Sequence, residues 1–484
     1  MLPYMRCVSV VLIASLAGCT PICRNKPLDQ RNTNVGYRFD LLDIGENNTD
    51  SVFICLTFSG GGTRAAALAY GVLQGLRDTA IAGLSPTDPP RCLLDEVDLI
   101  SSVSGGSFTA TGYGLWRGEV FDGRLESRFL KRDIQWYLLC DLWKPKNLLR
   151  LPLVLLDRIE VAACYYHEEI FDKKTYGDLL KLNRRPYVVV NATDLARGQR
   201  FSFTQDDFDM LGSDLSSLPV GWSVAASSAF PMVLSPLRLK YYPGDAMSDT
   251  IKDALTAPEN RRDRLRCRWA NSLLARHTCD DANPYEIDAE NHRYLYLMDG
   301  GLVDNLGLTY VIREYRTGFI RERIENGRID KLVVVIVDAV TEPPEDLESK
   351  AIAPGLFKVG VKTGTTGMDN YSAALTEIVR HELLEVLPQM RKTHESCRAA
   401  LRESCPEGMT LEEALPKPPA EALVDAYVID INFRRITDER KRRSFLSIIT
   451  SFFLPSEDVR GLIEEGRRLA VEHPELRRLI SDLE

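Results

Sequence analysis

The stretch VFICLTFSGGGTRAAALAYGVLQGL, residues 52–76, decides the fold. Its first seven residues are apolar and rich in β-formers, three glycines follow, and residues 65–76 are rich in Ala and Leu. This order predicts a strand, a tight loop and a helix. Such a unit is typical of α/β proteins with a parallel sheet.

The same order of strand, small residues and helix recurs along the chain. A second strand-like run at 96–100 is followed by small residues through 107 and then by a helical pattern. Further strand-like runs lie at 187–190 and 331–337. Strands that alternate with helices predict an α/β fold whose mostly parallel central sheet is wrapped by helices.

Bulk composition limits the domain organisation and the class of partner. The 484 residues are 44% hydrophobic and 27% charged, with a formal net charge of -9. We expect a single elaborated domain over 51–484, with insertions at about 241–291 and 342–422. The negative charge and the scattered basic residues argue against a nucleic-acid partner, and the sequence leaves protein partners unknown.

The N-terminus has the pattern of a targeting segment. Arg6 precedes a short apolar run, and Leu16-Ala-Gly-Cys19 resembles the lipobox of bacterial lipoproteins, whose cysteine is lipidated. We therefore expect a signal peptide over 1–18, acylation of Cys19 and a polar tether over 19–50. An ordinary secretory signal or an uncleaved anchor is the alternative. Thr20 favours an outer-membrane lipoprotein facing the periplasm, with secretion or inner-membrane retention as the alternatives.

Eleven cysteines fit an oxidising compartment. Cys267 with Cys279, and Cys397 with Cys405, are close enough in sequence to close short disulfide loops. Cys55 lies in an apolar run and is expected to be a buried thiol. No cysteine or histidine spacing indicates a metal site.

The glycine loop is the first candidate for chemistry. Ser59-Gly60-Gly61-Gly62-Thr63-Arg64 lies between a strand and a helix, where several backbone amides can face one anion. The pattern lacks the lysine of a P-loop and the spacing of a dinucleotide site. An oxyanion hole is the better interpretation, with Gly61 and Gly62 as donors and Arg64 fixing the loop or adding positive potential. A purely structural turn is the alternative.

Two further motifs supply a nucleophile and a base. Ser104, in Ser102-Val-Ser-Gly-Gly106, lies between a strand and a helix, as a nucleophile elbow requires, with small residues on either side. Asp299 ends an apolar run and precedes Gly300 and Gly301. Partial desolvation there would raise the pKa of this carboxyl and let it accept the serine proton.

Together, the three motifs resemble those of patatin-like phospholipases: GGGxR, a serine elbow and DGG, in the same order. The resemblance implies a three-layer α/β/α fold, with Ser104 as nucleophile, Asp299 as base, and Gly60, Gly61, Gly62 and Arg64 as the oxyanion loop. Further matches are 191–194, 225–231 and 449–454, the last resembling a bacterial lipoprotein branch. Two departures are Ser102, where the family usually has glycine, and Ala65, where glycine often follows the arginine.

These motifs predict acyl transfer through an acyl-enzyme, without a metal or cofactor. The expected substrate is a phospholipid or another long acyl ester, met at the membrane through the lipid anchor. A short-chain esterase with a Ser/His/Asp triad is one alternative, using His381, His394 or His473. A membrane-tethered binding or assembly factor without turnover is another. Asn191, Asp194, Ser227, Ser228, Asp304 and Asn305 are interpreted as scaffold.

Overall fold

The computed structural model of the protein describes residues 25–85, 87–142, 158–231, 233–242, 293–342, 356–404 and 417–484. The predicted signal peptide, Cys19, and the cysteines at 267, 279 and 405 lie outside the described residues.

Strands and helices alternate along the chain, as the sequence predicts. The strands are β1 (Lys26–Pro27), β2 (Val52–Phe58), β3 (Ala80–Ile81), β4 (Arg91–Cys92), β5 (Val97–Val103), β6 (Tyr187–Asp194), β7 (Gln199–Ser202), β8 (Ser213–Asp214), β9 (Leu237–Lys240), β10 (Tyr294–Asp299), β11 (Lys331–Asp338) and β12 (Asp425–Asn432). The α-helices are α2 (Gly62–Asp78), α3 (Gly105–Trp116), α4 (Ile134–Leu142), α7 (Arg158–Tyr165), α8 (Tyr176–Leu182), α9 (Gln205–Asp209), α10 (Val220–Ser227), α13 (Gly301–Asp304), α14 (Leu308–Thr317), α15 (Phe319–Glu325), α16 (Leu356–His381), α17 (Leu387–Ser404), α19 (Glu439–Leu446), α20 (Ser456–Glu472) and α21 (Pro474–Ser481).

The central sheet has the order β12-β11-β2-β5-β6-β10-β9, with β7 also paired to β6. β12, β11, β2, β5 and β6 run parallel, and β10 is antiparallel to β6. Every residue of β2 and β5 is buried, because helices cover both faces of a parallel sheet. The predicted mostly parallel α/β sheet is confirmed.

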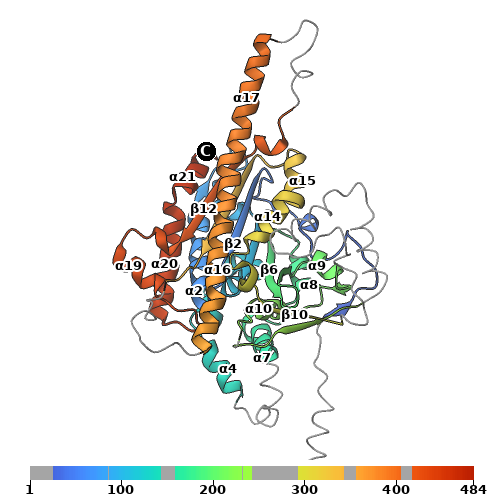
Figure 1. Cartoon of the computed structure of the whole chain (residues 1–484), viewed down its shortest axis with the longest axis vertical. Coiled ribbons are helices and arrows are strands. Elements are labelled where there is room, and N and C mark those ends of the chain that lie inside the picture. The colour runs from blue at the N-terminus through green and yellow to red at the C-terminus, as the bar shows by residue number, and fades with distance from the viewer. Residues whose placement is uncertain are drawn as a thin grey trace, which may run out of the picture.

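Helices cover the sheet in two layers (Figure 1). The crossovers from β2 to β5 and from β5 to β6 move one way along the sheet, and the crossover from β11 to β12 moves the other way. Because crossovers between parallel strands are right-handed, α2 and α3 lie on one face of the sheet, and α16 lies on the opposite face, where it contacts α14. α16 and α17 belong to the predicted 342–422 insertion, and α17 projects beyond the rest of the molecule (Figure 1).

Helix α20 packs closely along α2. A Cβ atom added at Gly71 would lie 2.1 Å from the carbonyl oxygen of Ile463, and one at Gly466 would lie 2.5 Å from that of Leu68. These glycines let the two backbones touch. The helical pattern predicted over 457–483 is present but is divided before Pro474. Cys55 is fully buried, as predicted.

Residues 25–50 differ from the solvated tether expected over 19–50. Tyr37 and Phe39 are 1% and 3% exposed, and Phe39 stacks on Phe319 with ring centroids 4.0 Å apart. The composition of this segment is polar, but its few aromatic residues bury enough apolar surface to fix it on the domain. No helix in the described ranges is both long and apolar enough to cross a bilayer.

Candidate active site

Ser104 occupies a strained turn between β5 and α3. Its φ and ψ are 48° and -119°, a conformation that costs energy for a residue with a side chain. The turn fixes the backbone so that the Ser104 N–H donates to Ser227 Oγ over 2.8 Å. The strand, turn and helix context predicted for a nucleophile elbow is therefore present.

Gly106 and Ser102, the small residues on either side of Ser104, are small for different structural reasons. A Cβ atom at Gly106 would lie 2.7 Å from the backbone oxygens of Phe58 and Ser59, so this glycine is required by the neighbouring β2 rather than by the elbow's own strand. Ser102 is fully buried, and its hydroxyl donates to the carbonyl of Val189 over 3.0 Å. That hydrogen bond explains how serine is accommodated at a position where glycine is usual in the resembling family.

The strand register brings Asp299 next to Ser104. β6 lies between β5 and β10, where Asn191 pairs with Val103, and Ala192 pairs with Asp299. The residue after Val103 and the last residue of β10 therefore meet at one edge of the sheet.

Asp299 is 4% exposed, and burial raises the pKa of its carboxyl to about 7. Hydrogen bonds from the Gly301 N–H, at 2.8 Å, and from the Ser104 side chain lower the pKa and offset part of that rise. A carboxyl that ionises near neutrality and accepts a serine hydrogen bond has the properties of a general base.

The two glycines after Asp299 permit a tight turn. A Cβ atom at Gly300 would lie 2.4 Å from the carbonyl oxygen of Asn191, so only glycine fits. One at Gly301 would lie 3.0 Å from Asp299 Oδ1. The turn thus directs the Gly301 amide onto the carboxylate.

The glycine loop lies beside the same pair. A Cβ atom at Gly60 would lie 3.3 Å from Ser104 Cβ. The Gly60 N–H is already bonded to the carbonyl of Asn305 at 2.9 Å, whereas the Gly61 and Gly62 amides have no hydrogen-bond partner in the described part of the chain. Gly61 and Gly62 have φ values of 136° and 62°, which favour glycine. Two unpaired amides beside a serine suit an oxyanion.

The Arg64 side chain ties the loop to distant backbone. Its guanidinium donates to the carbonyls of Ala339, at 3.0 Å, and Ile448, at 2.6 Å, and also reaches Thr450 Oγ1. Burial lowers the pKa of Arg64 to about 10. Of the two roles left open by the sequence, these contacts favour fixing the loop.

Residues 449–454 close the loop from the C-terminal side. The Thr63 N–H donates to the carbonyl of Ser451 over 2.8 Å, and a Cβ atom at Gly62 would lie 2.3 Å from the same oxygen. This segment, noted in the sequence only for its resemblance, thus fixes the start of α2.

Two residues interpreted as scaffold connect the site directly. Ser227 Oγ accepts from the Ser104 N–H and donates to the Asn191 carbonyl at 2.6 Å, while the Ser227 carbonyl accepts from the Gly300 N–H. Asn191 Nδ2 donates to the carbonyl of Ser102. In the sequence, these two residues are singled out only because they lie in segments that resemble those of the family, 191–194 and 225–231.

Asp304 and Asp194 act locally, as expected of scaffold residues, whereas the Asn305 carbonyl holds the Gly60 amide. Asp304 accepts from the backbone amides of Leu308 and Thr309 and caps α14. Asp194 accepts from the Ala196 amide in the turn after β6. Among the described residues, no group of three or more His, Cys, Asp or Glu is placed to hold a metal ion.

Replacing Ser227 by alanine is expected to destabilise the fold by about 1–3 kcal/mol, because the buried Ser104 amide loses its acceptor. The displaced elbow should also lower ester turnover by about ten- to a hundredfold. Denaturant unfolding and initial rates measure the two effects. The matched control is Ser228→Ala, whose hydroxyl bonds within its own helix to the Val224 carbonyl. Equal turnover in both variants would contradict the role of Ser227.

The histidines proposed for a triad lie elsewhere. His381, on α16, is exposed and pairs with Glu385 at 2.9 Å. His473 caps α21 and lies 3.6 Å from Asp430. His394 is on α17. In the part of the chain that the structure describes, no hydrogen bond joins any of them to the elbow serine.

Comparison with known proteins gives one sequence-level match and several structural ones. The family model described as patatin-like phospholipase matches residues 56–312, more than half of the chain. No curated protein sequence gives a significant match. Human GIVD cytosolic phospholipase A2 aligns with 14% identity and a TM-score of 0.43, over 90% of this chain and 60% of that one. VipD from Legionella pneumophila aligns with 10% identity and a TM-score of 0.31, over 93% and 71%. The chain thus spans about 60% of the length of the human protein.

Proposed function

Since the chain belongs to the patatin-like phospholipase family, we propose that it is a lipid acyl hydrolase of the phospholipase A type. In this proposal Ser104 is the nucleophile and Asp299 is its base. The observation that carries the proposal is the hydrogen bond between a serine on a strained turn and a buried carboxyl whose pKa is raised to about 7.

In the first half of the proposed reaction, Asp299 takes the Ser104 hydroxyl proton while the serine oxygen attacks the ester carbonyl carbon. The Gly61 and Gly62 amides stabilise the negative charge that develops on the carbonyl oxygen. When the tetrahedral intermediate collapses, the leaving alcohol takes the proton from Asp299. The acyl group stays on Ser104.

In the second half, Asp299 takes a proton from water and the resulting hydroxide attacks the acyl-enzyme. Collapse expels the serine oxygen, which recovers the proton from Asp299, and the fatty acid leaves. A single carboxyl therefore acts as base and acid in both halves, which suits a pKa near neutrality.

The pH dependence of kcat/KM is expected to follow the ionisation of Asp299. Only the carboxylate can accept a proton, and its pKa is raised to about 7, so kcat/KM should rise with pH between about 5 and 7 and level off above. Initial rates on a soluble ester between pH 5 and 9 measure this. A profile already flat at pH 5 would show a carboxyl that ionises in its ordinary range.

Long acyl esters of a membrane are the proposed substrate class. The family match supports lipid substrates, and acylation of Cys19, which lies outside the described residues, would hold the enzyme at a bilayer. We place the protein on the periplasmic face of a bacterial outer membrane, in the lipoprotein branch of the family.

The test is fatty-acid release from mixed phospholipid vesicles by the purified protein, with a parallel set of short-chain esters. Covalent labelling with an alkyl fluorophosphonate, followed by peptide mass mapping, identifies the reactive serine. Release from vesicles with label on Ser104 supports the proposal. Turnover of short esters alone would indicate a short-chain esterase, and a folded protein with neither turnover nor label would indicate a binding or assembly factor.

Alanine at His381, His394 or His473 is expected to leave kcat/KM within about twofold, because none of these side chains is hydrogen-bonded to Ser104 within the described residues and substitutions away from a site change little. His473→Ala is also expected to lose about 1 kcal/mol of stability with the cap of α21. Loss of activity in any one of them, with Asp299→Asn still active, would replace the dyad by a triad.

A further inference from the structure

A cavity lies at the opposite end of the sheet from Ser104. It has a volume of about 200 Å³, well above the roughly 10–15 Å³ that one water needs. Its wall includes Leu94, just before β5, Pro186, just before β6, and Arg117, which ends α3. Helix α3 therefore begins at the active site and ends at this cavity. Twelve helical residues separate the two sites by about 18 Å, so a ligand here would not be the ester undergoing attack.

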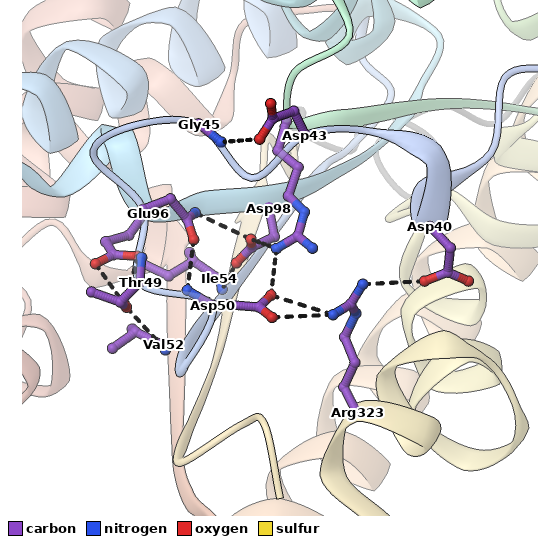
Figure 2. Close-up of polar contacts among 12 residues, drawn as sticks. Asp40, Asp43, Gly45, Thr49, Asp50, Val52, Ile54, Glu96, Asp98 and Arg323 are labelled. Carbon is purple, nitrogen blue, oxygen red and sulfur yellow. Dashed lines mark hydrogen bonds and ion pairs between the residues drawn. The ribbon is translucent and has the colours of Figure 1, made fainter. Parts of the chain in front are cut away.

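Four arginines line this cavity, and two of them are neutralised. Arg185 bonds to the carboxylates of Asp50, at 2.7 Å, and Asp98, at 2.8 Å. Figure 2 shows Asp50 and Asp98 at the centre of this network, with Arg323 on the other side of Asp50. The second, Arg77, pairs with the neighbouring aspartate at 78. Both arginines therefore already have a carboxylate partner.

Arg117 and Arg184 differ, because neither forms an ion pair within the described residues. Arg117 Nη1 is buried and has no hydrogen-bond partner in the part of the chain that the structure describes. Its Nη2 donates to the carbonyl of Arg184, and its guanidinium lies 5.7 Å from the Tyr113 ring. Burial lowers the pKa of Arg117, and the nearby charge of Arg184 lowers it further. A partly buried cation beside a second cation is stabilised when an anion binds between them.

The backbone supports a ligand-binding role for this residue. Arg117 has φ and ψ of 52° and -128°, a conformation that glycine adopts without strain and arginine does not. Strained residues of this kind cluster where ligands are held. Two carboxylates also reach the cavity wall, those of Glu46, which is exposed, and Asp95, whose carboxylate bonds to the Cys92 thiol.

We propose that this cavity, which we call the Arg117 cavity, binds a soluble phosphate monoester through Arg117 and Arg184. Two guanidiniums that form no ion pair with a described carboxylate match a dianion with three free oxygens, and the planar fork of each can bind two of them. The cavity opens at the sheet edge opposite the active site, which favours a dissolved ligand over a lipid headgroup. This inference is independent of the proposed hydrolase activity.

The experiment is calorimetric titration of the purified protein with inorganic phosphate and with glycerol 3-phosphate. Both are expected to bind, and Arg117→Gln and Arg184→Gln should each weaken binding about tenfold or more. Arg184 is exposed, so its variant tests the proposal even where Arg117→Gln fails to fold. The matched control, Arg460→Gln on the exposed face of α20, should bind like the unaltered protein.

Two results would overturn the proposal. The first is absence of binding by either anion, or binding that Arg184→Gln leaves unchanged. The second is cosedimentation with phosphatidylcholine vesicles containing phosphatidic acid that Arg184→Gln abolishes, which would assign the cavity to a lipid headgroup. Ester hydrolysis is measured in a separate assay. Absence of phosphate binding would therefore not affect the proposal that Ser104 is the nucleophile.

Discussion

Ser104→Ala is expected to lower ester hydrolysis by a factor on the order of 10⁴ or more, because removal of a nucleophile from a unit that acts together abolishes nearly all of its catalysis. The fold should persist, since the Ser104 backbone amide keeps its bond to Ser227. Fatty-acid release from vesicles and thermal unfolding measure the two quantities. The variant should also resist the fluorophosphonate label.

A matched control lies two residues earlier. The hydroxyl of Ser102, near the end of β5, is fully buried and bonds to the Val189 carbonyl. Ser102→Ala should therefore retain most of the activity. If Ser104→Ala kept its activity while Ser102→Ala lost it, the nucleophile would be misassigned.

Asp299→Asn is expected to remove a comparable share of activity and to stabilise the protein. An asparagine keeps an oxygen for the Gly301 amide but cannot take the serine proton. The carboxyl of the folded protein has a pKa of about 7, against 3.8 for the ordinary group. Between these values the unfolded chain has already lost its proton while the folded chain keeps it, so stability falls as pH rises from about 4 to 7.

Removing this carboxyl should therefore add on the order of 3 kcal/mol at pH 8, and less at pH 5. Denaturant unfolding at the two pH values measures the gain. The combination of lost activity and raised stability is specific to a buried catalytic base. A variant less stable than the parent at pH 8 would mean that the carboxylate is stabilised by its surroundings.

The fold was predictable where local patterns were strong. The apolar run at 52–58 coincides with β2, and 331–337 falls within β11, because strands buried on both faces are continuously apolar. β12 was missed because its residues alternate and lie beyond a polar segment. Burial of Tyr37 and Phe39 was missed because single aromatics in a polar stretch give no periodic signal.

The candidate site divides in the same way. Ser104, Asp299 and the glycines stand in short motifs, and the structure brings them to one edge of the sheet. Their roles stay predictions. The partners of Arg64 could not be found from sequence, because they lie 275 and 384 residues away. The same holds for Ser227, whose partner Ser104 lies 123 residues away. Contacts at such separations leave no local pattern.

The attachment of the glycine loop to residues near the C-terminus has a consequence for biosynthesis. The loop appears early in the chain, but its partners Ala339, Ile448 and Ser451 leave the ribosome hundreds of residues later. One edge of β2 likewise stays unpaired until β11 has been synthesised. Since the N-terminal part of a chain leaves the ribosome first, the glycine loop of the proposed hydrolase cannot be fixed, and the site cannot become competent, until residues as far as Ser451 have been synthesised.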